Sequence, residues 1–187
     1  MIELGNGQLD KIQTMIKRFP RAIPRAAASA INRSAETART EAVRGVRNEY
    51  VIQSKRIRET ISIEKASSSN LSAFVRSKGR PRALTYFKVN PKNIPKRKQR
   101  RLKAQVKHSS GGGMIKGAFL ARMKSGHLGV FNRLGKDRFP IVQRYGPSVP
   151  QMLENENVQN HVEARSAEML EKRMEHELSR MFEGGGR

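Results

Sequence analysis

The sequence predicts an α+β fold in which two long helical ends flank a strand-rich middle region. Three observations lead to this prediction. Apolar residues recur at helical spacing near both ends of the chain, short alternating segments fill the middle, and Ser, Asn, Gly and Pro separate those segments. The 187 residues suffice for about one domain. We expect three regions within one domain overall, namely residues 1–60, 61–150 and 151–187.

The first region predicts a short amphipathic helix followed by a longer one. One apolar face of the short helix is formed by Leu9, Ile12, Ile16 and Phe19. Pro20 ends this helix, because a proline disfavours helical backbone angles in the residue before it.

A second, longer helix is predicted from Ile23 to about Tyr50. This segment is rich in alanine, the strongest helix former, and Pro24 occupies a first-turn position where no hydrogen bond is lost. One face carries mostly small side chains, which suit close approach to another helix or a sheet. That face consists of Ile23, Ala27, Ala30, Ile31, Ser34, Ala38, Ala42 and Gly45.

The middle region changes to a two-residue period, which predicts short strands. Turn residues separate the segments, and Gly111–Gly113 form a flexible break. Five or six short strands indicate a small antiparallel sheet or an open barrel, whose strand order the sequence does not reveal. The candidate strands are Ile61–Ile63, Leu71–Arg76, Ala83–Val89, Gly117–Ala121, Leu128–Phe131 and Phe139–Val142.

The third region predicts one long helix from about Asn155 to Phe182, followed by a Gly-rich tail. Met at helical spacing usually belongs to a core, and otherwise to an interface that tolerates adjustment. A narrow apolar stripe runs along this helix and consists of Ala167, Leu170, Met174, Leu178 and Met181.

Positive charge is concentrated in the middle region. The chain has 38 Lys and Arg against 16 Asp and Glu, a net charge of +22, and residues 61–150 alone have 21 against 2. Six of the eight residues at 96–103 are basic, so this run repels itself and predicts a flexible basic arm at about 91–113. A solvated loop that keeps the protein soluble is the simpler interpretation.

An anionic partner is the interpretation that we favour, because phosphate binding is a common use of such a patch. Aromatic side chains are absent from the run itself, which favours contact through charge over recognition of bases. The candidate residues for binding nucleic acid or another anionic partner are Lys92, Lys96, Arg97, Lys98, Arg100, Arg101, Lys103 and Lys107.

Catalysis, cofactors and metals are not expected. The chain has no cysteine, which excludes disulfides and thiolate zinc sites. The middle region has only Glu64 and Asp137 as carboxylates, too few for a metal-dependent nuclease. No apolar run approaches the about 18 residues of a membrane span, and the N-terminus does not resemble a signal peptide. We therefore expect a protein of the reducing cytoplasm or of a particle assembled there.

Six segments follow one another in a characteristic order along the chain: Ile23–Arg33, Gly111–Gly113, Lys116–Leu120, Lys124–Arg133, Gly135–Ile141 and Tyr145–Pro150. In this order they resemble the minor tail protein Z family of long-tailed bacteriophages and prophages, also called tail completion proteins. The resemblance extends over about residues 20–155, and the last helix matches in type.

The resemblance implies a structural virion protein, assembled in the host cytoplasm, at the head-proximal end of the tail. It implies a homo-oligomer, such as a ring, with tail terminator, tube or tape measure proteins as partners and contact with the DNA end through the basic arm. The alternative is an intracellular protein that binds nucleic acid without sequence preference. Two apolar faces, one on each of the long predicted helices, are candidate interfaces. Their candidate residues are Ala27, Ala30, Ile31 and Ala38 on the first helix, and Leu170, Met174, Leu178 and Met181 on the last.

Overall fold

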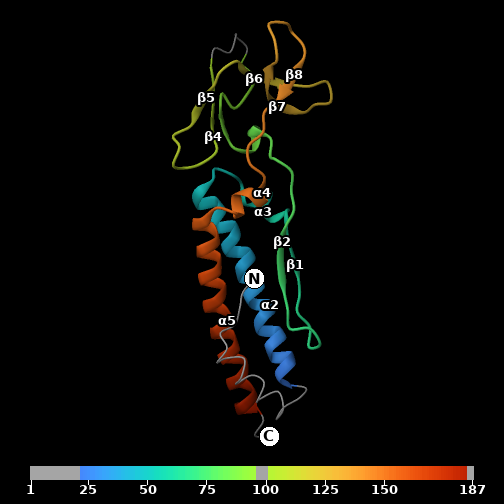
Figure 1. Ribbon diagram of the computed structural model, residues 1–187, viewed down its shortest axis with the longest axis vertical. Coiled ribbons are helices and arrows are strands. Elements are labelled where there is room, and N and C mark those ends of the chain that lie inside the picture. The colour runs from blue at the N-terminus through green and yellow to red at the C-terminus, as the bar shows by residue number, and fades with distance from the viewer. Residues whose placement is uncertain (1–21, 96–100, 185–187) are drawn as a thin grey trace. The chain divides into compact units, whose positions relative to one another are not determined.

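The computed structural model describes residues 22–95 and 101–184, and it confirms the α+β fold (Figure 1). The short helix predicted around residues 9–19 lies outside the described residues. The helices are α2 (Ala22–Glu49), α3 (Ser54–Arg58), α4 (Val149–Leu153) and α5 (Glu156–Gly184), with a 3₁₀ turn at Leu84–Tyr86. The strands are β1 (Ile61–Glu64), β2 (Phe74–Ser77), β3 (Lys88–Asn90), β4 (Leu102–Gln105), β5 (Gly113–Ile115), β6 (Ala118–Arg122), β7 (Leu128–Arg133) and β8 (Ile141–Gln143).

The described chain divides into two compact units, and each takes residues from all three sequence regions. The helical unit comprises residues 22–42, 61–76 and 159–184. The basic unit comprises residues 43–60 and 77–158, without the undescribed residues 96–100.

In the helical unit, α2 and α5 lie side by side and run in opposite directions (Figure 1). Ser34 Oγ donates to the backbone oxygen of Ser166 at 2.7 Å, and His161 Nε2 lies 2.8 Å from Glu41 Oε2. Ser29, an earlier residue of α2, donates to a later residue of α5, Glu177. The small face of α2 is buried, which confirms that it serves close packing; its buried residues in this unit are Ile23, Ala27, Ala30, Ser34, Ala38 and Ala42.

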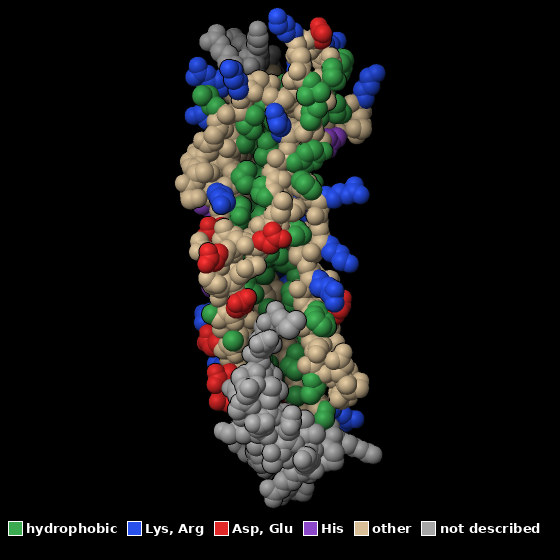
Figure 2. All heavy atoms as spheres, viewed as in Figure 1, with side chains coloured by type: hydrophobic (Ala, Val, Ile, Leu, Met, Phe, Trp, Pro, Cys, Tyr) green, Lys and Arg blue, Asp and Glu red, His purple; other side chains and the backbone are tan. Residues whose placement is uncertain are grey.

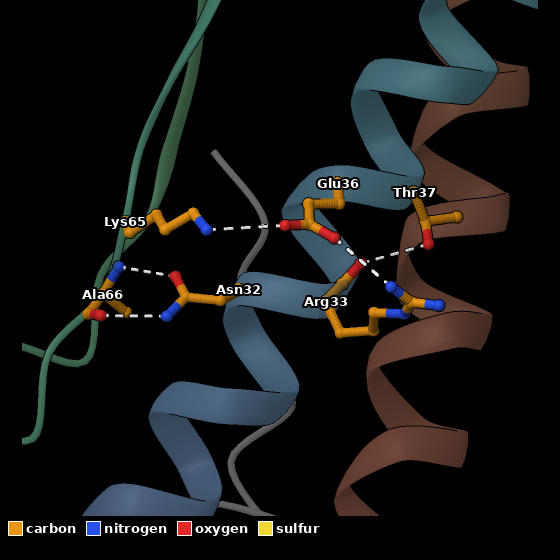
Figure 3. A network of polar contacts seen from close by, with 6 residues as sticks. All are labelled: Asn32, Arg33, Glu36, Thr37, Lys65 and Ala66. Carbon is orange, nitrogen blue, oxygen red and sulfur yellow. Dashed lines mark hydrogen bonds and ion pairs between the residues drawn. The ribbon is translucent and has the colours of Figure 1, made fainter.

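The β1–β2 hairpin is attached to α2 through the side chain of Asn32 (Figure 3). The Asn32 amide donates to the backbone oxygen of Ala66 at 2.9 Å and accepts from its backbone N–H at 2.7 Å. Next to this pair, Lys65 Nζ lies 3.5 Å from Glu36 Oε1, and Arg33 Nη1 lies 3.3 Å from Glu36 Oε2. One amide side chain therefore satisfies both backbone groups of a residue beyond the end of β1.

The basic unit contains two antiparallel sheets of three strands, in the orders β3-β4-β5 and β6-β7-β8. Its core includes Ile57, Leu102, Val130 and Met152, none of which has exposed surface. With β1-β2, the described strands form three small sheets, and no closed barrel is present among them. The sheet predicted from the sequence is thus divided into three.

Three segments of the middle region differ from what the sequence predicts for them. In place of one strand over Ala83–Val89, the chain forms the 3₁₀ turn and then the short strand β3. Leu84 and Phe87 are both buried, and their three-residue separation requires a turn, because residues three apart in a strand face opposite sides. Residues 102–105 lie within the segment expected to be a flexible arm, yet they form β4, which pairs with β3 and β5, and Leu102 is fully buried. Gly113–Ile115 form the unpredicted strand β5, which begins at the last glycine of the expected flexible break.

The long helix α5 confirms the helix predicted for the third region, and a short helix, α4, precedes it. Ser148 caps α4: its Oγ accepts from the Gln151 N–H at 3.4 Å, while Gln151 Oε1 accepts from the Ser148 N–H at 2.9 Å. These reciprocal bonds satisfy two backbone donors at the helix N-terminus. Pro150 occupies the first turn, where a missing N–H costs nothing.

Candidate partner-binding surface

Positive charge is concentrated in one of the two units. The sequence ranges of the basic unit, 43–60 and 77–158, contain 24 Lys and Arg against 5 Asp and Glu, a net charge of +19. The remaining ranges contain 14 against 11, a net charge of +3. On the face shown in Figure 2, Lys and Arg side chains project from the sheets of the basic unit. An anionic partner would therefore be attracted mainly to the basic unit.

The structure describes four of the eight predicted binding residues, and all four are exposed: Lys92, Arg101, Lys103 and Lys107. Lys96, Arg97, Lys98 and Arg100 lie outside the described residues. Lys103 is held on β4, where it pairs in register with Met114 while its neighbour Leu102 faces the core. Lys107 follows β4, and its Nζ lies 5.6 Å from the ring centre of Tyr50.

A groove with a volume of about 920 Å³ lies within the basic unit. Its lining comes from the end of α2 and the start of α3, the 3₁₀ turn and β3, and single residues of β6 and β7. Four exposed cations line it, and none of the described lining residues is Asp or Glu. These cations are Arg47, Lys55, Lys88 and Lys92.

The sequence predicted only Lys92 among these four cations. Arg47, Lys55 and Lys88 belong to three different elements, and the fold brings them together around the groove. No local pattern in the sequence signals such a grouping, because each cation is isolated from the dense run at 96–103. The basic arm and the groove share Lys92, so the two candidate surfaces are connected.

Two tyrosines and one phenylalanine also line the groove, and only one of these three is exposed. Tyr50 and Phe87 are 5% and 6% exposed, so their ring faces are covered. Tyr86 is 37% exposed, and the Arg56 guanidinium lies over its ring at 4.7 Å from the centre. Apart from the exposed imidazole of His108, the groove thus offers cations and aliphatic side chains rather than open aromatic faces.

Some of the predicted apolar interface residues are buried by packing inside the chain. Ala27, Ala30, Ala38 and Leu170 are buried. Ile31, Met174 and Leu178 are half-buried and keep surface for another protein, and the side chain of Met181 is outside the described part of the structure. The interface itself stays a prediction and now rests on three residues, Ile31, Met174 and Leu178.

The β7–β8 connection exposes large apolar side chains that the sequence did not single out. Leu134 and Phe139 are 68% and 64% exposed, and Val142 on the edge strand β8 is 42% exposed. The Arg138 guanidinium lies 5.6 Å from the ring centre of Phe139. In sequence, Leu134 is separated from Phe139 by Gly135 and three charged residues, and the run Phe139–Val142 predicts a strand rather than an exposed patch.

Metal-binding clusters and membrane-spanning helices are both absent from the described part of the chain. No group of three or more His, Asp and Glu side chains there is arranged to hold a metal ion. None of the described helices is long and apolar enough to cross a membrane.

The fold is α+β, and one of its two units carries most of the positive charge. The model of the prophage minor tail protein Z (GPZ) family matches residues 8–183, nearly the whole chain, and the protein belongs to this family. It is therefore a minor tail structural protein of a phage and a component of the virion. No curated protein and no solved structure matches the chain.

Proposed function

We propose that this minor tail protein completes the tail at its head-proximal end, where it holds the DNA end or an acidic neighbour through the basic arm. The unequal division of charge between the two units carries this proposal, because a basic surface binds phosphates or carboxylates by charge alone. The role is structural rather than catalytic. The exposed residues Lys92, Arg101, Lys103 and Lys107 supply the described part of this contact.

A ring of identical subunits is the proposed form of assembly. Closed homo-oligomers repeat one interface around a symmetry axis, so each subunit needs a surface that remains accessible after folding. Ile31, Met174 and Leu178 meet this requirement because they are half-buried. Tail terminator, tube and tape measure proteins are the proposed neighbours, with assembly in the host cytoplasm.

Quantitative mass spectrometry of purified phage particles from the source strain tests the proposal. We expect the chain in clean particles at a copy number that matches one small ring. A major component present in hundreds of copies would contradict the role at the tail end. Absence from clean particles would overturn the proposal and favour an intracellular nucleic-acid-binding protein, the alternative that family membership does not support.

A further inference from the structure

We propose that the groove of the basic unit binds an extended acidic segment of a neighbouring tail protein. This inference deepens the proposed function, on which it rests, by assigning a partner class and a site. The first observation is charge. Arg47, Lys55, Lys88 and Lys92 line the groove, and no acidic residue is among the described residues that line it with them. A segment rich in Asp or Glu complements this surface.

The rest of the lining favours a polypeptide over single-stranded nucleic acid. Proteins that bind single strands stack bases on open aromatic faces. Here Tyr50 and Phe87 are buried, and Arg56 already lies over the ring of Tyr86. In their place, the half-buried aliphatic side chains of Val51 and Val89 line the groove and suit the apolar residues of a peptide.

The backbone of β3 offers a second means of recognising a peptide. Among the described strands, β3 is an edge strand that pairs only with β4, and two of its residues, Lys88 and Val89, line the groove. In an antiparallel ladder, alternate residues direct their N–H and C=O groups away from the partner strand. An extended peptide can pair with such an edge, while the cations at the groove select its acidic side chains.

Fluorescence anisotropy with the full chain tests this inference. The probes are a labelled ten-residue peptide of alternating Glu and Val, the same peptide with Gln for Glu, and a labelled single-stranded DNA of ten nucleotides. We expect the Glu peptide to bind most tightly. The triple variant Lys55→Glu, Lys88→Glu, Lys92→Glu should weaken its binding by about tenfold or more, since each change replaces attraction with repulsion.

The control is the variant Lys116→Glu, Lys124→Glu, Lys136→Glu, which makes the same charge change at exposed lysines of the basic unit outside the groove. It should change the affinity by less than about threefold. Circular dichroism of both variants establishes that they are folded.

Three results would overturn the inference: no binding of the Glu peptide, equal weakening in both triple variants, or tighter binding of the DNA through the same lysines. The first two would reject the groove as the site, and the third would assign it to nucleic acid. All three are distinct from absence of the protein from particles, which would reject the proposed function itself.

Discussion

Gly146 is a position where the basic unit has no room for a side chain. A Cβ placed there would lie 2.6 Å from Cε2 and 3.0 Å from Cζ of Phe87. Phe87 is 6% exposed and follows directly after the 3₁₀ turn, so its ring cannot move aside without disturbing buried structure. The glycine therefore allows the aromatic ring to pack against backbone.

The variant Gly146→Ala should destabilise the protein by about 1–3 kcal/mol, because adding a methyl group to a well-packed site forces neighbouring groups to shift. The free energy of unfolding in urea measures this effect. Gly135→Ala is the matched control, since nothing lies within 4 Å of a Cβ at that position. Equal stability of the two variants would contradict the packing described for Phe87.

Single residues illustrate what the sequence did and did not predict. The pair Ser148 and Gln151 has the spacing of a capping box, so α4 could have been found from its sequence. The hydrogen bonds between Asn32 and Ala66 could not have been predicted from the sequence, because the two residues are 34 positions apart and Asn32 lies in the interior of a helix. Long-range pairs of this kind depend on the fold, and no local pattern marks them.

At the scale of elements, the prediction was good where a period extended over many residues. The Ala-rich face of α2 and the Leu and Met stripe of α5 recur over several turns, and both helices were predicted nearly to their ends. β4 was missed because Leu102 is its only fully buried residue and stands beside a run of cations. One apolar residue does not establish a two-residue period.

Replacing Lys96, Arg97, Lys98, Arg100 and Arg101 with Gln should leave tail assembly intact and reduce the infectivity of the particles. The physical reason is that this change removes five positive charges of the basic arm and leaves the buried Leu102 of β4 in place. Electron microscopy of the particles and plaque counts measure the two effects. Unchanged infectivity would mean that this run serves solubility alone.

At the scale of the whole molecule, counting charges along the sequence located the positive surface but not the groove. The middle region was correctly identified as basic. The end of α2 and the start of α3 nevertheless contribute Arg47 and Lys55, which lie outside that region. A site made from several segments becomes visible only when the topology of the fold is known.

Self-association provides a prediction at this scale. The double variant Met174→Ser, Leu178→Ser should shift the protein toward smaller species in sedimentation velocity, because two half-buried apolar side chains of α5 would lose their proposed contact with a neighbouring subunit. The control Leu134→Ser, Phe139→Ser removes two exposed apolar side chains of the β7–β8 connection. If only the control variant shifts to smaller species, the interface lies at the β7–β8 connection and not on α5.

The concentration of charge in one unit also affects how stable the isolated protein is. Groups of like charge held within one compact unit repel each other, and this repulsion opposes folding. A partner that neutralises the charge binds the folded form and so increases its stability by mass action. The basic unit, with a net charge of +19, would thus be least stable before assembly and most stable once its surface is covered. Subunits incorporated into the tail would then be protected, while unassembled copies would remain susceptible to unfolding and proteolysis.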